Sequence, residues 1–253
     1  MKTMALYNNK GGVGKTTATI NIAYILAQVK NKKVLVIDCD GQQNISRFLA
    51  DDIKKFGVEE SIINPAVSPV SSLTNTRYEN IDVLVSTPKI NDCFKEFDRL
   101  SENKQKENVR RLREYWNGAN TNSYDYILLD MPPALNHLTE NILGIADGVI
   151  VPVELGMFAI QGIAKVTDTI NKVGSSFTGC FISKFDRHNK SDYQLKEILD
   201  STLGNKVFNT VIPYSNIIRN SVNYRITACE YMKWMSPSKK YEELTDEIIR
   251  KVN

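Results

Sequence analysis

The chain has 253 residues, of which 42% are hydrophobic and 24% charged, and its formal net charge at pH 7 is +3. This composition is that of a globular protein, and the length allows one α/β domain over residues 1–253 with no linker between domains. A pI near 8.5 is only mildly basic, so the overall charge neither requires nor excludes a nucleic-acid partner.

Several kinds of protein are excluded by patterns that the sequence lacks. No run approaches the ~20 apolar residues of a membrane span, and no signal-peptide pattern precedes the first strand. The four cysteines are widely scattered and form no CxxC pair, so neither a zinc site nor a disulfide framework is indicated. We therefore expect a soluble protein in the reducing cytoplasm.

The first predicted strand, residues 4–7, leads into a glycine-rich loop, NNKGGVGKTT, and a helical pattern follows over residues 16–30. Glycines let a backbone wrap around a polyphosphate, so that amide groups and the helix N-terminus face the anion. In such a loop Lys15 reaches the β- and γ-phosphates, and the Thr16 hydroxyl completes a Mg²⁺ shell. Asn9 replaces the first glycine of the strict G-x-x-x-x-G-K-[ST] pattern, and Lys10 is an additional lysine. The predicted nucleotide contacts in this loop are Gly11, Gly12, Val13, Gly14, Lys15, Thr16 and Thr17.

Two later strands of continuous apolar character end in aspartates. The strand at 34–37 is followed by Asp38-Cys39-Asp40, and the strand at 126–130 ends in Asp130 before two prolines. Acidic residues at the carboxyl ends of parallel strands lie where α/β proteins bind ligands. A carboxylate beside the phosphate loop can hold a Mg²⁺-bound water, although a strand-terminal aspartate can also cap the next turn. We interpret Asp130 as a Walker B residue.

The remaining pattern alternates strands with helices. Residues 46–76 are predicted as helix and loop, 81–85 as a strand, and 89–116 as a charged helix. The apolar face of that helix would consist of Phe94, Phe97, Leu100, Val109, Leu112 and Tyr115. Its basic residues are read as a solvated face, with nucleic-acid binding as the alternative. Strands at 149–153, 177–183 and 207–212, with a helix at 160–173 and no hairpin signals, predict a doubly wound, mostly parallel sheet with helices on both faces.

Four motifs in order carry a resemblance to a known family: NNKGGVGKTT, VLVIDCDGQQN, YDYILLDMPP and VIVPVELGMFAIQG. The later segments VIPYSNIIRNSVNY and SPSKKY agree with it as well. Over nearly its whole length the chain resembles the ParA/MinD group of deviant-Walker-A (SIMIBI) P-loop ATPases. It is most similar to the short ParA/Soj-type partitioning ATPases that lack an N-terminal helix-turn-helix domain.

The resemblance implies an ATP- and Mg²⁺-dependent ATPase with particular site residues. Lys10 would cross the interface of an ATP-sandwich dimer to the partner's phosphates, as an arginine finger does in trans. Lys15 and Thr16 would serve their own nucleotide, and Asp40 would orient the attacking water. The implied catalytic residues are Lys10, Lys15 and Asp40, and the implied metal shell is Thr16, Asp38 and Asp130. The family usually reads D-P-Q-G-N where this chain has DGQQN, so we expect ATP binding with a weak intrinsic rate of hydrolysis.

The resemblance also implies contacts to the base and to DNA. Pro213 and Asn216 match the adenine-side segment, and Ser183-Lys184 falls where the base is approached. Met157 and Phe158 would either line that region or belong to the core. Non-specific duplex binding is assigned to Arg219, with Arg187 and Arg225 beside it and an extension through Lys233, Lys239 and Lys240. The alternative for each of these basic residues is a solvated surface position with no contact to DNA.

The implied partners are a second copy of the chain on ATP binding, double-stranded DNA of the nucleoid and a ParB-like centromere-binding adaptor. The cargo is a plasmid, chromosome or integrative element. One alternative is a MinD-like membrane-associated ATPase, which the acidic residues of the segment 241–253 disfavour. An iron–sulfur reductase is disfavoured by Met131, which stands where a cluster cysteine would follow the Walker B aspartate. A nucleotide-gated scaffold with negligible turnover stays open because of the altered DGQQN segment.

Overall fold

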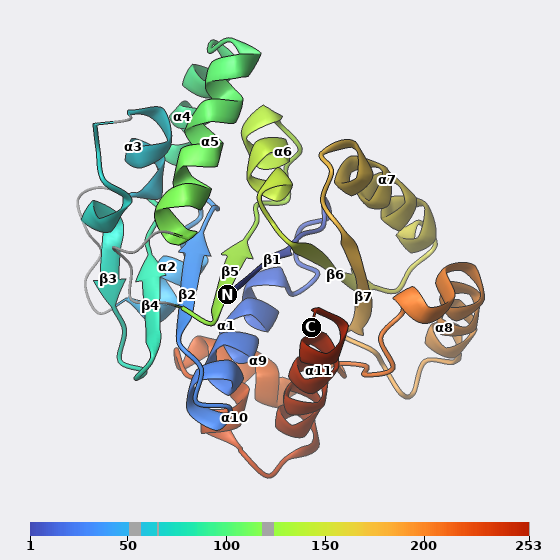
Figure 1. The fold of residues 1–253 in the computed structure, drawn as a ribbon. Coiled ribbons are helices and arrows are strands. Elements are labelled where there is room, and N and C mark those ends of the chain that lie inside the picture. The colour runs from blue at the N-terminus through green and yellow to red at the C-terminus, as the bar shows by residue number, and fades with distance from the viewer. Residues whose placement is uncertain (51–56, 65, 118–123, 253) are drawn as a thin grey trace.

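Continuous apolar runs form the centre of the molecule. The computed structural model describes residues 1–50, 57–64, 66–117 and 124–252, and within them seven strands form one sheet of order β3-β4-β2-β5-β1-β6-β7 (Figure 1). All neighbouring pairs are parallel except the edge pair β3–β4. The strands are β1 (Lys2–Leu6), β2 (Val34–Asp38), β3 (Leu73–Asn75), β4 (Ile81–Leu84), β5 (Tyr126–Asp130), β6 (Gly148–Glu154) and β7 (Phe177–Ser183).

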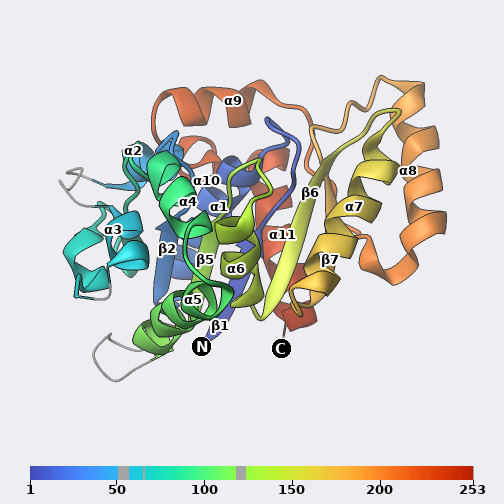
Figure 2. The same cartoon turned by 90° about the horizontal axis from the view of Figure 1, so that it is seen from above.

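Helices cover both faces of this sheet. Figure 1 shows α4 to α7 above the sheet and α1, α10 and α11 below it, and Figure 2 shows α8 beside the β7 edge. The helical segments are α1 (Lys15–Tyr24), the π-helical η1 (Ile25–Val29), α2 (Asn44–Leu49), α3 (Val58–Ile63), η2 (Pro69–Ser72), α4 (Ile90–Asp98), α5 (Glu102–Asn117), α6 (His137–Gly144), α7 (Ala159–Lys172), α8 (Lys190–Leu203), η3 (Gly204–Lys206), α9 (Asn216–Asn223), α10 (Ala228–Tyr231) and α11 (Ser236–Val252). The predicted doubly wound fold is confirmed.

The two faces bury separate apolar clusters because side chains alternate along each strand. On β1, Met4 and Leu6 pack with α1, α2 and α11, whereas Ala5 packs with α3, α4, α6 and α7. Such burial on both sides explains why the strands read as unbroken apolar runs. Within the described residues, no helix combines the length and apolarity needed to cross a membrane.

The central strands bring the two acidic strand ends beside the phosphate loop. β5 lies between β1 and β2, and in register Asp130 faces Leu6 on one side and Asp38 on the other. The carboxyl ends of these strands therefore meet at one edge, where α9 also lies, while both termini lie at the opposite edge (Figure 2).

Three sequence predictions about elements were wrong. Residues 207–212 form no strand of the sheet. Their contacts with β7 include the isolated bridge from Cys180 to Val207 and two backbone hydrogen bonds, from the Phe208 amide to the Cys180 carbonyl at 2.7 Å and from the Ile212 amide to the Ile182 carbonyl at 2.8 Å. The ladder is interrupted because the amides of Asn209 and Thr210 donate instead to the Glu247 carboxylate, at 2.7 and 3.0 Å.

The other two errors concern β3 and the charged helix. The antiparallel strand β3 lies inside a segment predicted as helix and loop, since its three residues carry no alternating pattern of their own. The predicted helix 89–116 is two helices, α4 and α5, and the Gln105 amide donates to the carbonyls of Phe97 and Leu100 at the break. Phe97 is buried as expected, with Phe94 and Leu100 packed beside it. The side chains of Val109, Leu112 and Tyr115 lie outside those described.

Replacing Gly179 by alanine should destabilise the fold more than the same change at Gly174. Gly179 has φ +150°, and an added Cβ would lie 2.5 Å from the Lys206 carbonyl and 2.6 Å from the Phe208 ring. Gly174 also has a positive φ, +77°, but its Cβ would meet nothing within 4 Å. We expect losses in the free energy of unfolding of about 3 kcal/mol for G179A and about 1 kcal/mol for G174A, measured by urea denaturation. Equal losses would contradict the close approach of residues 206–208 to β7.

Candidate functional site

The loop between β1 and α1 is fixed by contacts to two neighbouring strands. The Asn8 amide donates to the Pro152 carbonyl on β6 at 2.8 Å, and the Ser183 hydroxyl at the end of β7 donates to the Val13 carbonyl at 2.8 Å. Gly12 and Gly14 have φ of +75° and +90°, a left-handed conformation that glycine adopts without strain. Gly14 is also the N-cap of α1. The loop therefore holds its shape through glycine backbone geometry and two side-chain anchors.

The two lysines of the loop occupy opposite environments. Lys15 is buried at 7% exposure, and its Nζ donates to the carbonyls of Asn8 and Lys10 at 3.0 and 3.1 Å. Burial lowers the pKa of the Lys15 ammonium, and the nearby Asp130 and Asp40 charges oppose that shift. The Lys10 side chain is exposed, while its backbone amide donates to Asn8 Oδ1 at 2.9 Å. Lys15 thus faces inward across the loop and Lys10 faces solvent.

Two carboxyl groups lie buried beside the start of α1. Asp130 is 1% exposed and accepts hydrogen bonds from Thr16 at 2.8 Å and Thr19 at 3.2 Å. Burial, and then the Asp38 charge, raise the pKa of Asp130 to about 8. Asp38 is fully buried, and burial raises its pKa to about 6, although a hydrogen bond from Ser46 opposes this. Asp40, two residues after β2, is only half-buried.

These groups are the oxygen donors that Mg²⁺ prefers. The Thr16 hydroxyl donates directly to Asp130. Asp38, on the neighbouring strand β2, is the register partner of Asp130. A divalent cation favours the ionised carboxylates, because its charge offsets the burial that raises their pKa. No group of three or more His, Cys, Asp and Glu side chains in the described chain is arranged to hold a metal ion. Water and phosphate oxygens would therefore complete such a shell, as is usual for Mg²⁺.

A cavity of about 350 Å³ opens on the far side of the loop, between Gly14, Thr17 and α9. Pro213, which the resemblance placed on the adenine side, lines it together with Ser183 and Lys184. Asn216 is not among its lining residues. It begins α9, and Tyr214 and Ser215 before it line the cavity in its place.

Met157 and Phe158 neither line this cavity nor belong to the core. They are 84% and 71% exposed, just before α7. The core interpretation is therefore wrong, because the chain leaves the sheet at the end of β6 and turns outward before the helix begins, whereas a place beside the base stays a prediction.

The three predicted DNA contacts are exposed and surround α9. Arg219, on α9, lines the 350 Å³ cavity, so it is also close to the nucleotide loop. Arg187 lines a smaller cavity of about 210 Å³ with Tyr214 and Ser215. Arg225 follows α9 in a left-handed conformation, and its guanidinium donates to the Ala50 carbonyl at 3.5 Å.

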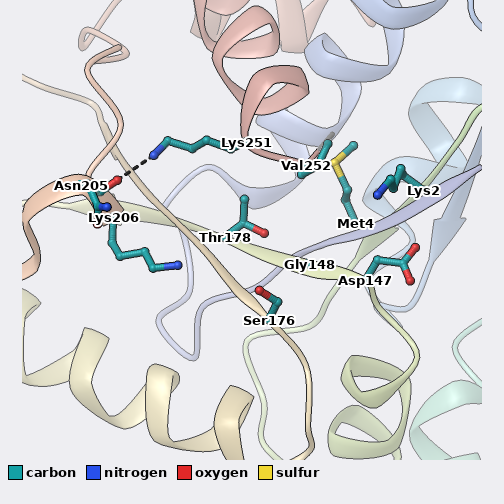
Figure 3. Close-up of a pocket in the computed structure, with 10 residues that line it drawn as sticks. All are labelled: Lys2, Met4, Asp147, Gly148, Ser176, Thr178, Asn205, Lys206, Lys251 and Val252. Atoms are coloured by element: carbon teal, nitrogen blue, oxygen red, sulfur yellow. Dashed lines mark hydrogen bonds between the residues drawn. The ribbon is translucent and has the colours of Figure 1, made fainter.

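A separate polar pocket lies at the opposite edge of the sheet (Figure 3). It measures about 330 Å³ and includes Lys2, Lys206, Lys251 and Asp147. Much of its charge is already engaged in wall contacts: Lys206 and Lys251 donate to backbone carbonyls, and Asp147 pairs with Arg113. It contains none of the loop or acidic residues above.

Sequence reasoning missed several residues that hold the site together. Thr19 lies three residues after Thr16, so the two hydroxyls share one face of α1 and both donate to Asp130. This spacing could have predicted the Thr19 contact from the sequence. Ser46 and Ser86 surround Asp38 and Asp40 but belong to no motif. Ser183 was considered only for the base, although its hydroxyl anchors the loop.

Comparisons with known proteins agree with this geometry. A family model described as an AAA domain matches residues 1–180. The sporulation initiation inhibitor protein Soj of Bacillus subtilis is 30% identical over 221 residues, with 84% of each chain covered. The chain belongs to the ParA/MinD family of P-loop ATPases. The predicted family and ATPase activity are confirmed.

Further relatives extend the match to nearly the full length. The chromosome partitioning protein ParA of Caulobacter vibrioides is 28% identical to this ParA/MinD-family ATPase, with 98% of this chain and 94% of the relative covered. An ATP complex of a Cyanothece McdA variant has a TM-score of 0.83 at 20% identity, covering 99% of this chain and 96% of that one. MinD of Pyrococcus horikoshii, complexed with Mg-ADP, has a TM-score of 0.76 at 20% identity, covering 98% and 95%.

Replacing Asp130 by asparagine should stabilise the nucleotide-free ATPase at neutral to alkaline pH. Because the pKa of Asp130 is raised to about 8, the folded state retains a proton that the unfolded chain releases near pH ~4. The wild-type free energy of unfolding therefore falls as pH rises from ~4 to ~8. Asparagine cannot ionise, so we expect D130N to be more stable by about 2 kcal/mol at pH 8, with the difference vanishing toward pH 4.

Urea denaturation across this pH range measures the effect, and Asp125→Asn is the matched control. Asp125 precedes the same strand but is exposed. No gain for D130N at pH 8, or an equal gain for D125N, would contradict the buried, raised-pKa state of Asp130.

Proposed function

We propose that this ATPase dimerises on binding ATP and Mg²⁺, binds double-stranded DNA non-specifically, and partitions a plasmid, chromosome or integrative element together with a ParB-like adaptor. The observation that carries the proposal is the division between the two loop lysines. Lys15 is buried inside its own loop, whereas Lys10 is exposed and makes no side-chain hydrogen bond or ion pair within the described residues. A cation held in this way is free to reach the phosphates of a second protomer.

The residues of one protomer divide the work of binding and hydrolysis. The amides of residues 11–17 and the start of α1 bind the phosphates, and Lys15 neutralises them. Thr16, Asp38 and Asp130 would hold Mg²⁺, which would supply positive charge to offset that of the phosphates. Asp40 orients the attacking water, and Lys10 of the partner subunit places a cation on the charge that develops in the transition state. Pro213 lies beside the adenine base, and Asn216 contributes to the same side as the first residue of α9.

The structure also favours partitioning over a MinD-like membrane role. The α11 residues Tyr241, Leu244 and Ile248 are buried against the α1 side of the sheet, so this helix has no free apolar face for a bilayer. Double-stranded DNA is favoured over a membrane as the binding partner, because Arg219, Arg187 and Arg225 are exposed around α9. Joining two such patches in a dimer strengthens weak phosphate contacts through effective concentration, so ATP would switch nucleoid binding on.

Lys10→Ala should abolish ATP-dependent dimerisation and lower turnover by about 100-fold or more, because the cation delivered in trans is lost. Sedimentation with ATP and Mg²⁺ measures the dimer, and steady-state phosphate release with and without duplex DNA measures turnover. Lys33→Ala, which removes an exposed lysine outside the loop, should change neither dimerisation nor turnover. Wild-type turnover no higher than that of Asp40→Ala would leave a nucleotide-gated scaffold as the function. A K10A protein that dimerises normally would remove the basis for a shared site.

Arg219→Glu should reduce ATP-dependent retention on duplex DNA by about tenfold or more, because phosphate contacts are replaced by repulsion. The salt dependence of binding should become shallower. Since Arg219 also lines the cavity beside the loop, ATP affinity is measured separately, and Arg99→Glu at the exposed end of α4 is the control. Unchanged DNA retention in R219E would show that the patch lies elsewhere.

A further inference from the structure

The segment between β2 and α2 departs from its family at two positions, and the structure gives a physical reason for both. Gly41 stands where the family has proline, and its Cβ would lie 2.7 Å from the Asn91 side chain and 3.0 Å from Ile90. Gln43 stands where the family has glycine, yet it keeps a left-handed conformation with φ 59°. That conformation is unfavourable for glutamine, so surrounding contacts must hold it.

Those contacts converge on Ser86, which follows β4 and is fully buried. The Gln43 side-chain amide donates through Nε2 to the Ser86 carbonyl at 2.8 Å, and Gln43 is itself only 5% exposed. The Ser86 hydroxyl donates to the Asp40 carbonyl at 2.8 Å. The Ser86 amide donates to the Ser46 hydroxyl at 3.0 Å. All three polar groups of this serine therefore bind the segment 40–46.

The same contacts fix both ends of the Asp40 peptide unit. Its amide donates to Asp38 Oδ1 at 3.0 Å, and its carbonyl accepts from Ser86. Ser46 connects the two halves, because its hydroxyl also donates to Asp38 Oδ2 at 2.7 Å. In the part of the chain that the structure describes, the Asp40 carboxylate is held by one hydrogen bond, from the Gln42 backbone amide to Oδ1 at 3.0 Å, so its position depends on the backbone that Ser86 restrains.

We propose that Ser86 is a positioning residue for hydrolysis, which sets the place of Asp40 by restraining its backbone and the left-handed Gln43. The inference rests on the proposed role of Asp40 in orienting water. Within the described residues the hydrogen bonds of the Ser86 side chain, amide and carbonyl go to Asp40, Ser46 and Gln43 and not to the loop NNKGGVGKTT, so its role concerns the rate of hydrolysis and not the affinity for ATP. In this chain the Gln43–Ser86 bond takes over the task of the missing glycine.

The test compares kcat and KM for Ser86→Ala with those of a matched buried serine. Ser72 is also fully buried, and its hydroxyl also donates to a backbone carbonyl, that of Pro69 at 2.9 Å, but it lies beside β3. S86A leaves the Asp40 carbonyl with its second donor, the Gln43 backbone amide at 2.9 Å, so we expect it to fold. Losing the one hydrogen bond should lower kcat roughly five- to tenfold with KM for ATP within about twofold of wild type. S72A should leave both unchanged.

Gln43→Asn removes the hydrogen bond between the Gln43 side chain and the Ser86 carbonyl, so it tests the same restraint. This variant replaces S86A as the test if S86A fails to fold. Asparagine tolerates the left-handed conformation but is too short to reach Ser86, so kcat should fall again with KM unchanged. Turnover in D40A equal to wild type would reject the role of Asp40 and with it the proposed mechanism. An inactive D40A together with wild-type kcat in S86A and Q43N would reject the positioning role alone. A rise in KM equal to the fall in kcat would also reject it.

Discussion

The structure depends on the burial of two carboxyl groups and one ammonium where β1, β5 and β2 end side by side. Removing Asp38, Asp130 and Lys15 from water is costly, and the fold offsets the cost with hydroxyl donors and backbone carbonyls close to each group. Burial still leaves the pKa of both carboxyl groups raised. The site is therefore most favourable when a cation and a polyphosphate supply the missing charges, which is the condition under which an ATPase of this family acts.

The same strands explain why the loop shape and the acidic pair are inseparable. Asn8 is tied to β6 and Val13 to β7, while Asp130 on β5 binds the first turn of α1. A rigid set of neighbouring strands thus presents the loop backbone, and connections between strands and helices complete the site. The segment after β2 is such a connection, and its unusual residues are accommodated by α4 and by Ser86.

Most of the sheet could be predicted from the sequence, because most of its strands are continuous apolar runs that are recognisable one by one. The strands at 126–130 and 177–183 have the predicted bounds, and the parallel arrangement follows from their unbroken apolar runs. The segment 207–212 has the same appearance but is not a strand, since Glu247 from a distant helix takes two of its amides. The sequence also did not reveal that α9 begins at Asn216, because that boundary depends on the Ser215 hydroxyl, which caps the helix by accepting from the Ile217 amide.

The sequence by itself determined the phosphate loop, the acidic strand ends, the family and the activity, because these depend on short motifs whose spacing is fixed by local backbone geometry. Only the tertiary structure decided that Lys15 is buried and Lys10 exposed, that Thr19 supports Asp130, and that Ser86 restrains Asp40. Burial and hydrogen bonding join residues that are dozens of positions apart, and no local pattern encodes such pairs. The order of the strands brings them together.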